Sequence, residues 1–224
     1  IVTISAEPSD SRIWDFQKLD IPVITLKHSR LGSICLGPAS LSRILERNRT
    51  DILHSQGIRA DFLNSLSRQP CTRISTQRND PFQDYPKLFG TIAGSIAART
   101  HKTILLNIPH VISCSFSIED ANVRHGIPCL TIQNGISTNH TFLVSRKAKL
   151  ATRTRLGLPR KPLLYISVGP LIYRKNTLNL IRAFGQAANA SARHLVLLGD
   201  GPLMPKVQRL TEEFKNVTAI GHVE

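Results

Sequence analysis

The sequence predicts an α/β protein with mainly parallel sheets, and two observations support this class. Short β-branched, apolar runs alternate with segments of helical periodicity along the whole chain. Two of the apolar runs end at a glycine, Gly169 and Gly199, that leads toward the next helical segment. Strands separated by helices of this length are typical of βαβ units, whose strands pair in parallel.

Nine segments have the composition of strands, and they fall into two groups. A polar, basic stretch from Ile136 to Pro162 separates the first six segments from the last three. In chain order the predicted strands are Ile1–Ser5, Pro22–Leu26, Asp51–His54, Thr72–Thr76, His110–Cys114, Cys129–Gln133, Leu163–Val168, His194–Leu198 and Val217–Ile220.

The grouping predicts two α/β domains joined by a linker. We expect residues 1–140 to form the first domain, residues 141–161 a basic linker with a short helix around Arg146–Leu156, and residues 162–224 the second domain. We expect the first strand region of the first domain to be missing, because the chain opens inside a strand-like run. The second domain has fewer strands than a doubly wound sheet normally has, so we expect it to be truncated.

The chain is strongly basic, with a net charge of +14 and no acidic residue between Asp120 and Asp200. Such a surface attracts phosphates, nucleic acid or anionic lipid headgroups. A solvated basic linker is the alternative interpretation of the same stretch. Aromatic residues make up only 5% of the chain and no RNA-binding signature occurs, so we expect no specific nucleic-acid partner.

The four cysteines and the apolar runs indicate in which cellular compartment the protein is expected. The cysteines lack the spacing of zinc ligands, and no apolar run is long enough to span a bilayer. We therefore expect reduced thiols in a cytoplasmic protein with no metal site.

Residues 167–184, SVGPLIYRKNTLNLIRAF, place two cations between a strand-ending glycine and a helix. Arg174 and Lys175 would lie close to a helix N-terminus, where a cation is unfavourable unless an anion binds beside it. The segment LLGDGP repeats the pattern of strand, glycine turn and helix, with Pro202 expected at the first helical position. An exposed loop with incidental cations and a tight βα turn are the alternatives.

Three further motifs follow predicted strands in the first domain. His54 ends the strand in DILHSQG, Arg78, Asn79 and Asp80 follow the strand in STQRNDP, and Asn134 follows the strand in CLTIQNGIS. The carboxyl ends of parallel strands are where such folds bind ligands. A structural histidine and ordinary turn chemistry are the alternatives.

Taken in order, four segments resemble the group 1 (family four) retaining glycosyltransferases of the GT-B fold. They are DILHSQG, VISCSFSIEDANVRHGIPCLTIQNGIS, RTRLGLPRKPLLYISVGPLIYRKNTLNLIRAF and HLVLLGDGPLMPKVQRL followed by NVTAIGHVE. They look most like bacterial enzymes of surface polysaccharide and lipopolysaccharide biosynthesis. The resemblance implies two Rossmann-like domains, the C-terminal one truncated. The N-terminal domain would bind the acceptor and the C-terminal domain the nucleotide-sugar donor, without a cofactor or a metal.

The resemblance also implies roles for the motif residues. It assigns catalysis to Lys175 and Arg174, which would neutralise the leaving diphosphate, and to His54. The donor-binding residues would be Gly169, Arg174, Lys175, Gly199, Asp200, Gly201 and Pro202, and the acceptor-binding residues Arg78, Asn79, Asp80 and Asn134.

Two departures from the family pattern accompany these assignments. Pro170 stands where the family commonly has arginine, and the paired glutamates of the donor site would lie beyond Glu224. We therefore expect this fragment not to turn over, and an inactive, truncated remnant is the alternative function. The expected acceptor is a glycan or a lipid-linked glycan, and the charge suggests peripheral contact with the anionic inner face of a membrane.

Overall fold

The computed structural model describes residues 1–8, 11–136, 145–187 and 192–223. The chain divides into two compact units, Ile1–Ile136 and Ser137–Glu224. Each unit is built of parallel strands with intervening helices, which confirms the predicted α/β class. The start of the predicted linker, residues 141–144, lies outside the described residues.

The N-terminal unit has a parallel four-stranded sheet in the order β3-β4-β5-β6 and a separate parallel pair, β1 with β2. Each strand overlaps a predicted one. The strands are β1 (Val2–Thr3), β2 (Ile24–Thr25), β3 (Ile52–Ser55), β4 (Thr72–Gln77), β5 (His110–Ser113) and β6 (Leu130–Thr131).

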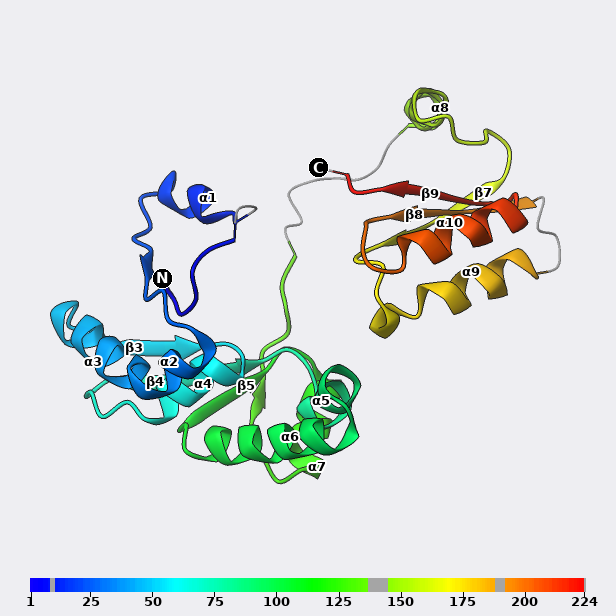
Figure 1. The fold of residues 1–224 in the computed structure, drawn as a ribbon. Helices are drawn as coiled ribbons and strands as arrows, with labels where there is room; N and C mark the ends of the chain where they lie inside the picture. Colours follow the sequence, from blue (N-terminus) through cyan, green and yellow to red (C-terminus); the bar gives the residue numbers. More distant parts are fainter. Residues whose placement is uncertain (9–10, 137–144, 188–191, 224) are drawn as a thin grey trace. The chain divides into compact units, whose positions relative to one another are not determined.

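The helices of this unit begin at recognisable signals and flank the strands (Figure 1). Asp80 caps α5, Ser115 caps α7, and Gly90, with φ of 82°, turns the chain from α5 into α6. The helices are α1 (Ile13–Gln17), α2 (Arg30–Cys35), α3 (Gly37–Arg47), α4 (Ile58–Ser65), α5 (Pro81–Phe89), α6 (Thr91–Leu106) and α7 (Phe116–Arg124).

The C-terminal unit has a parallel three-stranded sheet in the order β7-β8-β9. Helices α9 and α10 pack together against it through buried Ile181, Val207 and Leu197 (Figure 1). The elements are α8 (Arg146–Arg155), β7 (Leu163–Val168), the short 3₁₀ helix η1 (Tyr173–Lys175), α9 (Thr177–Gly185), β8 (Arg193–Leu198), α10 (Met204–Glu213) and β9 (Val217–Gly221).

The predicted start of the last helix at Pro202 is wrong. Helix α10 begins at Met204, and Pro205 is the proline of its first turn. The amide of Leu203 donates to the carbonyl of Leu171 (3.0 Å), and the amide of Met204 donates to the carbonyl of Gly201 (2.9 Å). These bonds fold Pro202 and Leu203 into a turn before the helix starts.

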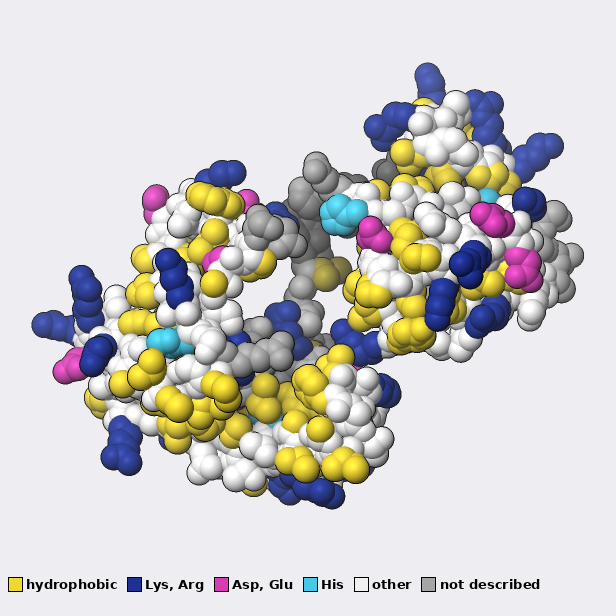
Figure 2. Space-filling view, viewed as in Figure 1, with side chains coloured by type: hydrophobic (Ala, Val, Ile, Leu, Met, Phe, Trp, Pro, Cys, Tyr) yellow, Lys and Arg dark blue, Asp and Glu magenta, His cyan; other side chains and the backbone are white. Residues whose placement is uncertain are grey.

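Helix α8 carries five cations on ten residues and has no buried side chain. Figure 2 shows lysine and arginine side chains projecting from this part of the C-terminal unit. The Arg153 guanidinium holds the helix in place, because its Nη1 donates to the carbonyls of Arg160 (2.8 Å) and Pro162 (2.9 Å). Within the described ranges, no helix combines the length and the apolar character that a bilayer crossing requires.

Candidate functional site

The carboxyl ends of the three C-terminal strands enclose a pocket of about 350 Å³. Parallel strands direct their carboxyl ends to the same edge, so residues that follow β7, β8 and β9 meet there. The lining residues are Val168, Gly169, Pro170, Leu198, Gly199, Asp200, His222 and Val223.

Glycine packing forms the base of this pocket. Gly199 has a φ of 131°, and a β-carbon on it would lie 2.1 Å from the carbonyl oxygen of Gly169. A β-carbon on Gly201 would lie 2.7 Å from the carbonyl oxygen of Leu171. Only glycine permits backbones to approach this closely, so at Gly199 and Gly201 the edge presents main chain without a side chain.

Backbone hydrogen bonds hold the strand ends together. The amide of Gly199 donates to the carbonyl of Gly221 (2.7 Å), and the amide of Gly169 donates to the carbonyl of Leu198 (2.9 Å). The amide of Leu171 in turn donates to the carbonyl of Asp200 (2.9 Å). The three loops therefore form one connected edge.

The two predicted cations lie on η1, directly before α9. Both Arg174 and Lys175 are exposed, and Asn176 enters the left-handed region (φ of 54°) to start the helix. Neither cation lines the 350 Å³ pocket. A third cation that the sequence analysis did not name lies at η1: Lys206 Nζ donates to the Tyr173 hydroxyl (2.8 Å).

Of the predicted donor-binding residues, the structure brings three into the pocket lining: Gly169, Gly199 and Asp200. Gly201 and Pro202 follow in the same loop but outside the lining. His222 also lines the pocket, and sequence reasoning missed it. The available signal was Gly221, a third strand-ending glycine in the same sheet, with the histidine next to it.

The predicted acceptor residues follow β4 and β6 at the carboxyl edge of the N-terminal sheet. His54 is the residue before the last one of β3. His54 is exposed, and its Nε2 lies 2.7 Å from Thr76 Oγ1 on β4. Arg78 and Asn134 are exposed as well. The Asn79 amide donates to Asp84 Oδ2 (3.1 Å).

Asp80 serves the backbone of α5. It is only 9% exposed, and its Oδ1 accepts a hydrogen bond from the amide of Phe82 (2.9 Å). This is the geometry of a helix N-cap. The structure therefore places Asp80 at the predicted edge with its carboxylate already engaged.

A buried polar cluster, centred on the fully buried Asp61 of α4, lies behind this edge. Asp61 Oδ1 accepts hydrogen bonds from the hydroxyls of Ser55 (2.6 Å) and Ser75 (2.7 Å). Its Oδ2 lies 2.8 Å from Nε2 of buried His101 on α6 and accepts from the Gln77 amide (3.2 Å). The carboxylate thereby joins the ends of β3 and β4 to two helices.

The protonation of this cluster follows from its surroundings. Burial raises the pKa of Asp61, but hydrogen bonds from His101, Ser55 and Ser75 and the charge of His101 outweigh it, so the pKa lies below its usual value. Burial and the nearby carboxylates Asp61 and Asp84 raise the pKa of Tyr85 to about 12. Its hydroxyl, 2.8 Å from His101 Nδ1, therefore stays protonated. No periodic pattern in the sequence indicates this cluster.

Among the described residues, no group of three or more histidine, cysteine, aspartate or glutamate side chains is arranged to hold an ion. The chemistry available in the C-terminal pocket is thus that of main-chain groups, Asp200 and His222, with cations on the neighbouring η1.

Comparison with known proteins shows which solved structures share this fold. No protein-family model and no curated protein sequence matches the chain significantly. Among solved structures, HepE of Anabaena in complex with UDP and glucose matches 100% of this chain and 62% of its own, with a TM-score of 0.74 at 16% identity. Sucrose-phosphate synthase from Thermosynechococcus elongatus matches 100% of this chain and 60% of its own, with a TM-score of 0.71 at 17% identity.

WaaG, a glycosyltransferase involved in lipopolysaccharide biosynthesis, matches 100% of this chain and 70% of its own, with a TM-score of 0.61 at 13% identity. These structural neighbours are GT-B glycosyltransferases, so the predicted GT-B fold is confirmed. The chain spans about 60% of the length of HepE and the synthase.

Proposed function

We propose that the chain is part of a retaining glycosyltransferase that moves a sugar from a nucleoside diphosphate to a surface glycan or a lipid-linked acceptor. The observation that carries the proposal is the glycine-built pocket at the carboxyl ends of β7, β8 and β9. It offers a close-packed main-chain surface at the edge where doubly wound sheets bind ligands. HepE, which shares the fold, was crystallised with UDP and with UDP-glucose.

In this proposal the nucleoside diphosphate lies across the edge formed by Gly169, Gly199 and Asp200. The phosphates can approach the backbone of this edge closely because Gly169 and Gly199 carry no β-carbon. Lys175 and Arg174, on the exposed η1, neutralise the diphosphate as the bond to the sugar breaks. A cation held in place where negative charge develops lowers the barrier without reorganising at the moment of reaction.

The acceptor occupies the corresponding edge of the N-terminal unit. Arg78, Asn79 and Asn134 provide polar groups there, and His54 provides an imidazole positioned by Thr76. The Asp61 cluster keeps the ends of β3 and β4 in register, so these side chains follow from strands with a fixed separation.

Calorimetric titration with UDP and with uridine tests the donor site. UDP binds and uridine binds much more weakly, because the diphosphate supplies the charge that Lys175 recognises. Lys175→Ala weakens UDP binding about tenfold or more, since a hydrogen bond to a charged group contributes about 1.5–3 kcal/mol. Lys161→Ala, an exposed lysine just before β7, is the matched control.

Two results would contradict the donor site. One is equal affinity for UDP and uridine. The other is equal loss of UDP affinity in the Lys175 and Lys161 variants, which would reduce the effect to net charge.

We also propose that α8 contacts an anionic membrane surface, which would keep the protein near a lipid-linked acceptor. Five cations on ten residues, without an acidic neighbour in the helix, support this contact. Each cation near such a surface contributes about 1 kcal/mol, so replacing Lys147 and Lys149 by glutamine weakens sedimentation with phosphatidylglycerol vesicles about 30-fold. Equal sedimentation with neutral phosphatidylcholine vesicles would exclude a role for charge.

A further inference from the structure

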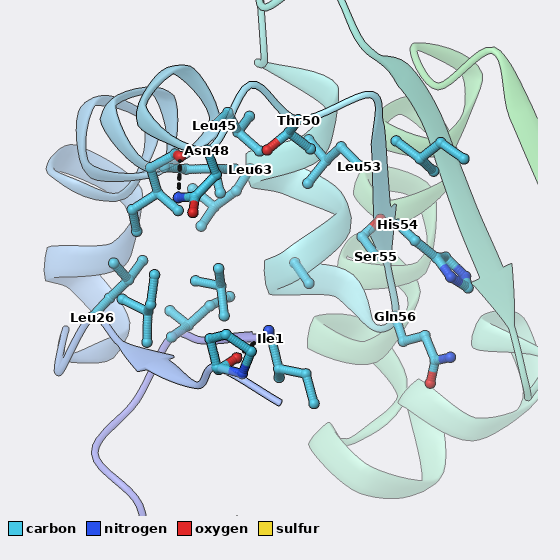
Figure 3. Close-up of a pocket in the computed structure, with 18 residues that line it drawn as sticks. Ile1, Leu26, Leu45, Asn48, Thr50, Leu53, His54, Ser55, Gln56 and Leu63 are labelled. Atoms are coloured by element: carbon cyan, nitrogen blue, oxygen red, sulfur yellow. Dashed lines mark hydrogen bonds between the residues drawn. The ribbon is translucent and has the colours of Figure 1, made fainter. Parts of the chain in front are cut away.

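A cavity in the N-terminal unit offers no cation to a ligand. It measures about 630 Å³, and Figure 3 shows Leu26, Leu45 and Leu53 around it, with the His54 ring pointing away from the space. No lysine or arginine is among the described residues that line it. A ligand with phosphate groups would find no cationic side chain there, in contrast to the carboxyl edge of the C-terminal sheet with its cations on η1.

Lys206 occupies a position in helix α10 that is unfavourable for a cation. It is the third residue of α10 (Met204–Glu213), and the first turn of this helix contains no acidic residue. The helix dipole is positive at this end, so a lysine here lowers the stability of the helix unless negative charge lies nearby. The same argument applies to Arg174 and Lys175, which precede α9.

The Lys206 ammonium reaches the segment that carries the other two cations. Its Nζ donates a hydrogen bond to the Tyr173 hydroxyl (2.8 Å) and lies 5.4 Å from the centre of the Tyr173 ring. Tyr173 begins η1, and Arg174 and Lys175 are the next two residues. Lys206, from the loop and helix that follow β8, thus joins two cations that follow β7.

The contact with Tyr173 leaves the charge of Lys206 uncompensated. An ammonium group has three N–H donors, and the tyrosine hydroxyl accepts one of them. Neither of the ion pairs found among the described residues involves Lys206, and the same holds for Lys175. Two donors and a full positive charge therefore remain for an anionic ligand.

Backbone hydrogen bonds connect the two segments that carry these cations. The Leu171 amide donates to the Asp200 carbonyl (2.9 Å), and the Leu203 amide donates to the Leu171 carbonyl (3.0 Å). The Asp200 carboxylate is turned toward its own loop, where its Oδ1 accepts from the Gly201 amide (2.6 Å). The start of α10 is therefore tied to the segment that leads into η1, which keeps Lys206 within reach of Tyr173.

We propose that Lys206 is a third phosphate-binding cation of the donor site and that Tyr173 positions its ammonium group. The inference rests on the proposed function, since the phosphates belong to the nucleoside diphosphate. Arg174 and Lys175 approach the diphosphate from the loop after β7, and Lys206 approaches it from the loop after β8. Cations fixed in two connected loops stabilise the charge that develops on the leaving diphosphate.

Calorimetric titration with UDP tests the role of Lys206. Lys206→Met removes the ammonium and keeps an unbranched side chain, so UDP affinity should fall about tenfold. Lys206→Arg keeps a cation at this position and should retain UDP affinity within about threefold. Tyr173→Phe removes only the hydroxyl that positions the ammonium and should weaken UDP binding about threefold.

The control for these variants is Lys215→Met. Lys215 is an exposed lysine of the same unit, and it lies just beyond the other end of α10, before the amino end of β9. This variant loses the same charge and should bind UDP as tightly as the original chain. Equal losses of affinity in Lys206→Met and Lys215→Met would overturn the proposal, because net charge alone would then explain both. Undiminished UDP binding by Lys206→Met would overturn it as well.

Protection of lysines from reductive methylation measures the contact without a substitution. Formaldehyde and a borane reductant methylate exposed lysines, and peptide mass spectrometry gives the rate at each one. At a free UDP concentration ten times its Kd, methylation of Lys206 and Lys175 should slow about tenfold, because it proceeds from the unbound protein. Lys161 and Lys215 should react as before. An unchanged rate at Lys206 while UDP is bound would overturn the proposal.

Inorganic pyrophosphate separates the failure of this inference from the failure of the proposed function. If the chain binds pyrophosphate but not UDP, and Lys206→Met weakens that binding, the phosphate site stands and the nucleotide-sugar assignment fails. If UDP binds and Lys206→Met changes the affinity of neither ligand, the proposed function stands and Lys206 has no part in it. A chain that binds neither ligand would overturn both.

Discussion

The two units hold the carboxyl ends of their strands together by different means. In the N-terminal unit a buried carboxylate, Asp61, accepts hydrogen bonds from side chains that belong to β3, β4 and α6. In the C-terminal unit the strand ends contact each other through glycine backbone, with Gly199 against the carbonyl of Gly169. The first edge depends on charge and the second on the absence of side-chain volume, so different substitutions should disrupt them.

The largest expected effect is at Asp61. Asp61→Asn removes the buried charge and places an amide donor opposite the donors of His101 or Ser55. Breaking a fully buried charged pair costs about 3–5 kcal/mol, so the free energy of unfolding of the N-terminal unit should fall by about that amount. Denaturant unfolding followed by hydrogen exchange of each unit measures it.

The matched control is Asp51→Asn, an exposed carboxylate one residue before β3. Its effect should stay within about 0.5 kcal/mol, as for surface substitutions generally. If Asp51→Asn destabilised as much as Asp61→Asn, the cluster would have no special role at this edge.

The second-largest expected effect is at the glycines of the C-terminal unit. Two substitutions there separate the steric overlap of an added β-carbon from the strain of a positive φ. Gly199→Ala brings a β-carbon to 2.1 Å from a backbone oxygen at a φ of 131°, whereas Gly169→Ala has a φ of 145° and nothing within 4 Å. We expect Gly199→Ala to destabilise by about 2–4 kcal/mol and Gly169→Ala by about half as much, since strain and overpacking each cost about 1–3 kcal/mol. Thermal unfolding of both variants measures the difference, and equal losses would show that the contact adds nothing to the strain.

The smallest expected effect is a pH dependence that differs between the units. The pKa of Asp61 is lowered in the folded state, so its contribution to stability is present above the unfolded pKa near 4 and is lost as the pH falls below it. Burial lowers the pKa of His194, so the unfolded state binds more protons below about pH 6.5 and the C-terminal unit loses stability as the pH falls through that region.

Unfolding midpoints measured for each unit between pH 8 and pH 3 test this order. The C-terminal unit should weaken first, and His194→Gln should flatten its slope between pH 7 and pH 5. An N-terminal unit that weakened first would contradict the assignment.

The alternation of apolar runs and helical segments was sufficient to predict the α/β class, whereas the GT-B fold was predicted from the resemblance of four motifs. All nine predicted strands overlap observed ones, because short β-branched, apolar runs between helical segments favour strands. The helix starts were harder to predict. Pro202 and Pro205 both suit a first turn, and the choice depended on hydrogen bonds from Leu203 and Met204 to residues elsewhere in the loops.

The pocket lining was predictable where residues directly follow strands, and the buried cluster was unpredictable because it depends on long-range contacts. Gly169, Gly199 and Asp200 follow strands, so their place at the pocket could be read from the sequence. The pairing of Asp61 with His101 joins residues 40 positions apart on two helices, and no local pattern indicates it. The roles of Lys175, Arg174 and His54 stay predictions.

Natural selection has few side chains to vary at the base of the C-terminal pocket. Any other residue at position 199 would place its β-carbon against a backbone oxygen, so we expect only glycine to be tolerated at this position. New ligand preferences can therefore arise at the side chains around it, for example at the rim through Pro170, Asp200 and His222. A library randomised at all four positions and selected for UDP binding should diversify at the rim and return glycine at position 199.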